Sequence, residues 1–134
     1  NVQSPQDSPI VWILDVAHNP QAVEHFLATL LLSPWSGFSK RAIIGFMKDK
    51  DYDGMLDLLV PHFDEFYCCD VEPPRGLKGS DLAKILQEKA GKKVKVFESL
   101  TEALALATST PDIGVNAVLG SFRVAVPAWR HLFQ

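Results

Sequence analysis

Residues 10–20 read Ile10-Val11-Trp12-Ile13-Leu14-Asp15-Val16-Ala17-His18-Asn19-Pro20. The run from Ile10 to Leu14 is apolar at every position, which is typical of a strand buried on both faces of a sheet. Pro20 fits the first turn of a helix, and apolar residues then recur at helical spacing as far as Leu32. This stretch therefore predicts a buried strand over residues 10–14 that leads through a polar loop into a helix over residues 20–32.

The same order of strand and helix repeats along the chain. Short apolar runs predict further strands over residues 42–46, 65–69, 93–97 and 116–119. Apolar residues at helical spacing predict further helices over residues 52–60, 80–90, 99–108 and 122–133. Ser80 and Ser99 are expected to cap two of these helices. Since alternating strands and helices form crossovers between parallel strands, the predicted fold class is α/β: a Rossmann-like three-layer domain with a mostly parallel sheet flanked by helices.

Length and composition favour one folded domain over residues 1–134. Hydrophobic residues make up 47% of the chain and charged residues 22%, as in ordinary globular proteins. Residues 1–9 are polar, contain two prolines and begin without a methionine. We expect them to form a linker or surface hairpin, and the chain to be a domain excised from a longer protein.

Charge and cysteine content argue against several classes of protein. The net charge is -3 and the lysines are scattered, which disfavours a nucleic-acid partner. No apolar run is long enough to span a membrane, and the N-terminal stretch lacks the pattern of a secretion signal. Cys68 and Cys69 are adjacent in an apolar run, where a mutual disulfide is strained. We therefore expect buried free thiols and a cytoplasmic protein.

The sharpest functional signal is the loop from Asp15 to Asn19, between the first strand and the first helix. In α/β sheets, ligands bind at the carboxyl ends of the strands, where this loop is expected to lie. There the Asp15 carboxylate can accept from nucleotide hydroxyls or an ammonium group, and His18 can donate to phosphate or carboxylate oxygens. A structural alternative is equally open, in which Asn19 caps the helix and Asp15 bonds to loop amides.

Weaker candidates follow later strands. The segment from Gly120 to Arg123 opens the last predicted helix, so its amides and the Ser121 hydroxyl can hold an anion, although a tight turn and a cap explain the same residues. Lys48-Asp49-Lys50-Asp51 is a charged loop in which Asp51 is also a candidate cap, and Arg75 follows two prolines as a candidate anion contact. The chain has no spacing typical of a metal site and no GxxxxGK[ST] phosphate loop. Its active site is therefore expected to be incomplete.

Four blocks of sequence carry a resemblance to one family. They are Ile13-Leu14-Asp15-Val16-Ala17-His18-Asn19-Pro20, Gly45-Phe46-Met47-Lys48-Asp49-Lys50-Asp51, Pro74-Arg75-Gly76 and Gly120-Ser121-Phe122. In order and spacing they resemble the C-terminal domain of bacterial folylpolyglutamate synthase/dihydrofolate synthase, within the Mur ligase superfamily. The resemblance extends from about Ile10 to the end of the chain.

This resemblance implies an ATP-dependent ligase assisted by Mg²⁺. A carboxylate of dihydropteroate or of a folate is phosphorylated, and the amino group of L-glutamate then attacks the acyl phosphate. It also implies an N-terminal ATP-binding domain, absent from this chain, that carries the phosphate loop and most Mg²⁺ ligands. The chain alone is therefore expected to be inactive. The alternative is a non-catalytic Rossmann-like module that binds a nucleotide or a protein partner by itself.

The resemblance also assigns roles to individual residues. It implies that Asp15 contacts ATP, that His18 lies between the ATP and glutamate sites, and that Ser121 assists glutamate binding. Neighbouring residues with less certain roles form a second group: Asn19, Lys48, Asp49, Lys50, Arg75 and Arg123. The chain departs from the family at Arg123, where histidine is common, and at Pro127, which interrupts the last predicted helix.

Overall fold

The computed structural model describes residues 2–3, 10–72, 74–110, 112–120 and 122–133. Its strands are β1 (Val2–Gln3), β2 (Val11–Leu14), β3 (Lys40–Ile44), β4 (Glu65–Cys69), β5 (Lys93–Phe97) and β6 (Val115–Leu119). Its helices are α1 (Pro20–Leu31), α2 (Tyr52–Leu59), the short 3-10 helix η1 (Val60–His62), α3 (Gly79–Ala90), α4 (Leu100–Ser109) and α5 (Phe122–Phe133). The predicted alternation of strands and helices is confirmed, and β1 and η1 are additional to it.

The described strands form one sheet in the order β1-β2-β6-β3-β4-β5. Neighbouring strands from β2 to β5 pair in parallel, and the short β1 pairs antiparallel with β2. β6 comes last in the chain but lies in the middle of the sheet, in register with β2 on one side and β3 on the other. The predicted α/β class with a mostly parallel sheet is confirmed.

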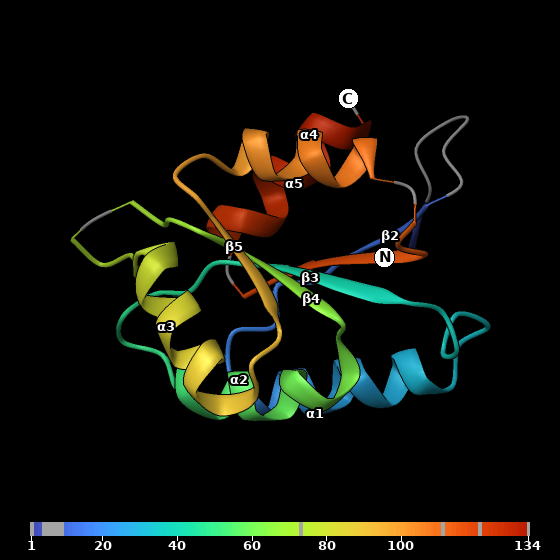
Figure 1. The fold of residues 1–134 in the computed structure, drawn as a ribbon, viewed down its shortest axis with the longest axis horizontal. Coiled ribbons are helices and arrows are strands. Elements are labelled where there is room, and N and C mark those ends of the chain that lie inside the picture. Colours follow the sequence, from blue (N-terminus) through green and yellow to red (C-terminus); the bar gives the residue numbers. More distant parts are fainter. Residues whose placement is uncertain (1, 4–9, 73, 111, 121, 134) are drawn as a thin grey trace.

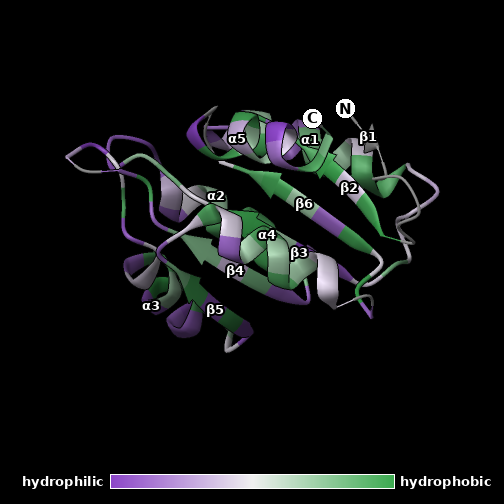
Figure 2. Ribbon diagram, turned by 90° about the horizontal axis from the view of Figure 1, so that it is seen from above, coloured by the Kyte–Doolittle hydropathy of each residue, from purple (hydrophilic) through white to green (hydrophobic). Residues whose placement is uncertain are grey.

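Helices cover both faces of the sheet, with α1, α2 and α3 on one face and α4 and α5 on the other (Figure 1). Because successive residues of a strand point to opposite faces, each central strand contributes to two apolar cores. Ile44 and Phe66 pack in the core beneath α1, α2 and α3, whereas Ile43 and Tyr67 pack in the core beneath α4 and α5. Figure 2 shows apolar residues along the strands and polar residues on much of the helices.

β3 begins two residues earlier than predicted. The apolar run placed this strand over residues 42–46, but Lys40 and Arg41 belong to it and are only 7% and 1% exposed. Lys40 can be buried because its ammonium group donates to the carbonyl oxygens of Ser36 and Phe38, at 2.6 and 2.8 Å. The predicted boundary was wrong because apolar patterning counts every charged residue as a surface residue.

Two of the predicted helix caps are also wrong. α3 starts at Gly79, and the amide of Gly79 donates to the carboxylate of Asp70 at 2.7 Å, so Ser80 is not the cap. Ser99 lies at the N-cap position of α4, but its side chain makes no capping hydrogen bond. By contrast, the Asn19 side chain caps α1 as expected.

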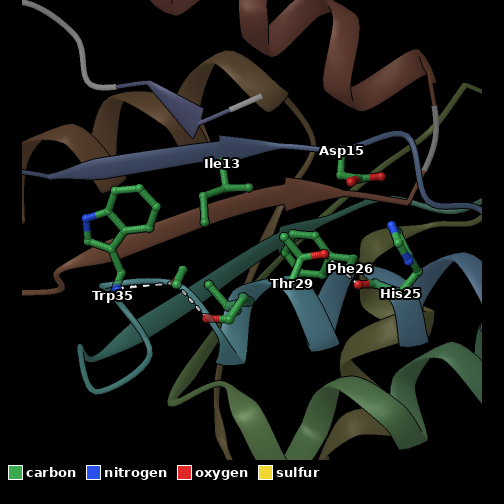
Figure 3. Close-up of a pocket in the computed structure, with 8 residues that line it drawn as sticks. Ile13, Asp15, His25, Phe26, Thr29 and Trp35 are labelled. Carbon is green, nitrogen blue, oxygen red and sulfur yellow. Dashed lines mark hydrogen bonds between the residues drawn. The ribbon is translucent and has the colours of Figure 1, made fainter.

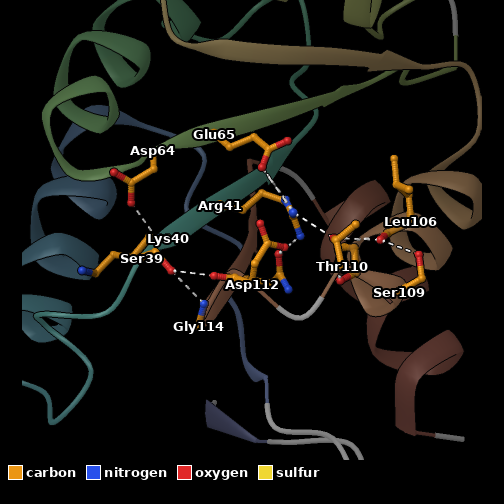
Figure 4. A network of polar contacts seen from close by, with 12 residues as sticks. Ser39, Lys40, Arg41, Asp64, Glu65, Leu106, Ser109, Thr110, Asp112 and Gly114 are labelled. Atoms are coloured by element: carbon orange, nitrogen blue, oxygen red, sulfur yellow. Dashed lines mark hydrogen bonds and ion pairs between the residues drawn. The ribbon is translucent and has the colours of Figure 1, made fainter.

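A buried arginine joins β3, β4 and β6 near the amino ends of the strands (Figure 4). The guanidinium of Arg41 donates to Glu65 from Nε at 3.3 Å and from Nη2 at 3.2 Å, to Asn116 at 3.1 Å and to Thr110 at 2.9 Å. Its Cζ atom also lies 4.5 Å from the centre of the Tyr67 ring. The side chains of Arg41 and Glu65 are 2% and 14% exposed, so salt screens this ion pair only weakly.

The two cysteines are free and buried in β4, as predicted. Burial, with a smaller effect from the neighbouring Asp70, raises the pKa of the Cys69 thiol to about 12. Burial likewise raises the pKa of Cys68 far above its ordinary value. Both thiols are therefore protonated and unreactive at neutral pH. None of the helices in the described part of the chain has the length and apolar character needed to cross a membrane.

The Arg41 network predicts a large loss of stability in Arg41→Met. Methionine keeps most of the side-chain length but leaves Glu65, Asn116 and Thr110 without their donor, and breaking a buried ion pair typically costs about 3–5 kcal/mol. Chemical denaturation of the chain measures the change. Lys89→Met is the matched control, because Lys89 forms ion pairs with Asp53 and Asp57, whose side chains are exposed. Equal effects of the two substitutions would contradict a structural role for the Arg41 network.

Candidate functional site

The carboxyl edge of the sheet contains a topological switch point. β2 and β3 lead into α1 and α2 on one face, whereas β6, which lies between them, leads into α5 on the other face (Figure 1). The loops that follow these strands therefore diverge at the carboxyl ends. Ligands of open α/β sheets bind at the carboxyl ends of the strands, next to such a switch point. The three segments singled out from the sequence follow β2, β3 and β6.

The loop after β2 is held by its own side chains. The Asp15 amide continues the sheet by donating to Val118 at 2.9 Å, and one oxygen of the Asp15 carboxylate accepts from the Ala17 amide at 2.8 Å. The Nδ1 atom of His18 lies 2.9 Å from the carbonyl oxygen of Val16. The structural role left open for Asp15 is thus observed. It leaves Asp15 Oδ2 and His18 Nε2 without a hydrogen-bond partner among the described residues, so both can meet a ligand.

The end of β6 approaches β3 closely at Gly120. Its φ angle is 116°, and a Cβ atom there would lie 2.4 Å from the carbonyl oxygen of Gly45 and 2.6 Å from the Phe46 ring. Glycine is therefore required by both the backbone conformation and the space. Ser121, the predicted glutamate-binding residue, lies outside the described residues. Arg123 is exposed in the first turn of α5.

The loops after β3 and β4 are joined by backbone hydrogen bonds. Met47 and Gly76 form an antiparallel bridge, the Leu77 amide donates to Phe46 at 2.9 Å, and the Lys48 amide donates to Arg75 at 2.7 Å. A Cβ atom on Gly76 would lie 2.1 Å from the carbonyl oxygen of Val71. We call residues 46–49 and 71–77, in their described part, the paired loops.

The paired loops carry most of the second group of candidate residues. Arg75 forms an ion pair with Asp49 at 3.4 Å, and both side chains are more than half exposed, at 65% and 54%. Lys48 is exposed and Lys50 half-buried. Asp51 caps α2 by accepting from the Gly54 amide at 2.9 Å, as the structural interpretation of this segment expected.

Two cavities flank the loop after β4. One, of about 250 Å³, is lined by Lys48, Asp70, Val71, Glu72, Gly76, Lys78 and Glu98. The other, of about 450 Å³, is lined by Asp70, Val71, Glu72, Arg123 and Pro127. The sequence analysis did not propose Asp70 or Glu72 as site residues. The position of Asp70, directly after a buried strand, could have identified it, because that criterion selected Asp15.

A third cavity lies between β2 and α1 (Figure 3). It has a volume of about 250 Å³, with Asp15 and His25 toward one end and Trp35 toward the other. Ile13 and Phe26 supply apolar wall between them. Asp15 therefore lies both at the switch point and at one end of this cavity.

The described residues contain no group of three or more His, Cys, Asp or Glu side chains that could hold a metal ion. Asp15 and Asp70 each use one carboxylate oxygen on a backbone amide, and Asp49 pairs with Arg75. The carboxylates at the carboxyl edge are thus spread over separate loops. A metal that acted here would need ligands from outside the described residues.

Fold and site together define a Rossmann-like α/β domain whose polar loops gather at the switch point. The sequence profile described as Mur ligase, glutamate ligase domain, matches residues 2–121. The chain belongs to this family.

Individual relatives are consistent with this family. The dihydrofolate synthase/folylpolyglutamate synthase of Escherichia coli K12 is 36% identical over 118 residues, which cover 87% of this chain and 26% of the relative. A structure of E. coli FolC in complex with DHPP and ADP matches with a TM-score of 0.82 at 29% identity, over 96% of this chain and 30% of that chain. A bifunctional folylpolyglutamate synthase/dihydrofolate synthase with Mn, AMPPNP and L-glutamate bound matches with a TM-score of 0.81 at 29% identity, over 98% of this chain and 31% of that one. This chain thus spans less than a third of the length of each.

The close packing of Gly76 predicts that Gly76→Ala destabilises the chain. The new methyl group must displace the Val71 carbonyl, and overpacking of this kind typically costs about 1–3 kcal/mol. Gly37→Ala is the matched control, because a Cβ atom there has no neighbour within 4 Å. Thermal unfolding of both variants measures the difference. A Gly76→Ala variant as stable as Gly37→Ala would show that the paired loops are not held as described.

Proposed function

We propose that this chain is the C-terminal domain of an ATP-dependent ligase that joins L-glutamate to dihydropteroate or to (poly)glutamyl folates through an acyl-phosphate intermediate. The observation that carries the proposal is the Asp15–His18 loop at the switch point of a glutamate ligase domain. Where α/β sheets bind ligands, this loop offers a carboxylate oxygen and an imidazole nitrogen that have no hydrogen-bond partner among the described residues.

The molecules bound in homologous structures support the proposed substrates and nucleotide. One homologous structure holds AMPPNP, Mn and L-glutamate, and another holds ADP and DHPP. Since this chain corresponds to less than a third of those proteins, the phosphate loop and the folate pocket are assigned to an N-terminal domain. That domain is the proposed partner of the carboxyl edge, and the cytoplasm, where ATP and folates occur together, is the proposed location.

The proposed roles follow from the chemistry of each side chain. Asp15 Oδ2 is proposed to accept from a ribose hydroxyl of ATP, while Oδ1 stays on the Ala17 amide. His18 lies between the nucleotide and the glutamate, and Ser121 is assigned to glutamate. Exposed Lys48 and Arg75 suit the anionic groups of the substrates. Further second-group residues are Lys50, Asp49, Arg123 and Asn19, of which Asn19 acts through its helix cap.

Magnesium is the proposed metal. It would neutralise charge on the transferred phosphate. The described residues offer no ligand cluster for it, so most of its ligands are assigned to the N-terminal domain. No step is therefore attributed to metal bound by this chain.

In the intact ligase, Asp15→Asn should lower the rate of ATP-dependent glutamate addition. Asparagine can keep the bond to the Ala17 amide but loses the charge, and a hydrogen bond to a charged group is worth about 1.5–3 kcal/mol, or about a 10- to 100-fold change in rate. The assay follows the mass of dihydropteroate or folate as one glutamyl residue is added. Asp112→Asn is the control, since Asp112 is exposed and follows α4 at the other end of the sheet. Equal rates in the two variants would contradict the assignment of Asp15 to the nucleotide site.

The isolated chain should not add glutamate and should bind ATP with a dissociation constant weaker than about 1 mM, because the rest of the nucleotide site is elsewhere. Calorimetric titration with ATP and Mg²⁺ tests the affinity. Tight binding by the isolated chain would favour the alternative function, an independent nucleotide-binding module.

A further inference from the structure

The hydrogen bond of His18 fixes which ring nitrogen carries the proton. Nδ1 lies 2.9 Å from the Val16 carbonyl oxygen, and a carbonyl oxygen has no proton to give. Nδ1 must therefore be the N–H that donates. A neutral imidazole carries one N–H, so Nε2 holds a lone pair and can act only as an acceptor.

The surrounding backbone holds the ring in this state. Asp15 is fixed by two hydrogen bonds: its backbone amide donates to the Val118 carbonyl oxygen, and its carboxylate accepts from the Ala17 amide. One residue beyond His18, Asn19 anchors the start of α1. The His18 side chain is partly exposed, and its Nε2 has no partner among the described residues. His18 thus presents an oriented imidazole acceptor at the switch point, where the sequence had suggested a donor to anions.

An acceptor suits one step of the proposed reaction. At neutral pH the amino group of an amino acid is an ammonium ion, which has no lone pair and cannot attack an acyl phosphate. We propose that His18 Nε2 takes a proton from the α-ammonium group of the incoming glutamate. This inference rests on the function proposed above and adds a proton-transfer role to it.

Two proton transfers accompany the formation of the amide bond. One N–H bond of the ammonium breaks and its proton moves to Nε2, which gives an imidazolium whose Nδ1–H remains on Val16. The amine lone pair forms the new N–C bond at the acyl carbon, and the C–O bond to the phosphate breaks with its electron pair leaving on phosphate. A second amine proton passes to the departing phosphate or to water, which leaves the neutral amide.

The tautomer can be tested on the chain itself. At about pH 8, above the ordinary imidazole pKa of about 6.5, ¹⁵N NMR distinguishes protonated from unprotonated ring nitrogens. We expect His18 to have a protonated Nδ1 and an unprotonated Nε2. Loss of the signals in His18→Asn identifies them. A protonated Nε2 in the neutral ring would overturn the proposal.

The proton-transfer role can be tested in the intact ligase with two nucleophiles. Hydroxylamine is largely uncharged at neutral pH and traps acyl phosphates as hydroxamates, so it needs no base. In His18→Gln, glutamate addition at saturating glutamate should fall about 10²- to 10⁴-fold, the usual contribution of a general base. Hydroxamate formation should stay close to that of the wild type.

Two further variants distinguish proton transfer by His18 from a role in binding or positioning. Asp15→Asn, if it acts on ATP, should slow both reactions in the same proportion. His18→Asn provides a second variant, because its side-chain NH2 can still donate to Val16 whereas its amide oxygen is too weakly basic to take a proton. Equal losses with glutamate and hydroxylamine in both His18 variants would assign His18 to binding or positioning and overturn the proposal. If the wild type adds no glutamate at all, it is the proposed function that fails.

Discussion

β6 lies between β2 and β3 although it is the last strand in the chain. All of its residues are buried, and it is paired on both sides. Without it, β2 has no parallel neighbour and neither apolar core is complete. The same pairing puts a strand that leads to α5 beside strands that lead to α1 and α2, and this reversal is the switch point next to which the loops with the candidate residues lie. The core and the site therefore depend on one strand.

The amino and carboxyl ends of the strands differ in how completely their charged and polar side chains are hydrogen-bonded. Near the amino ends, Arg41 is buried and its donors are used on Glu65, Asn116 and Thr110. At the carboxyl ends, Asp15 and His18 satisfy only half of their polar atoms within the loop. Buried charges that are paired within the fold contribute to its stability, whereas partly paired ones remain able to bind. The contacts that hold the sheet and the proposed ligand contacts thus lie at opposite ends of the strands.

Much of the fold could be predicted because apolar periodicity is a local property of the chain. The errors arose where distant residues decide the outcome. β3 includes Arg41 because its partners are 24 and 75 residues away, and α3 is capped by Asp70, nine residues before the Gly79 amide that it accepts from. The strand-end rule placed Asp15 at the carboxyl edge of the sheet, where the structure has it. It could not reveal that His18 bonds to Val16, which decides the tautomer and depends on side-chain geometry.

The paired loops have a consequence for redesign of this domain. Because Met47 and Gly76 are in register, the length of each loop is tied to that of the other. An inserted or deleted residue in either loop would shift Lys48 and Arg75 against each other and break the bridge between them. Redesign of these loops should therefore exchange their side chains and leave their lengths unaltered.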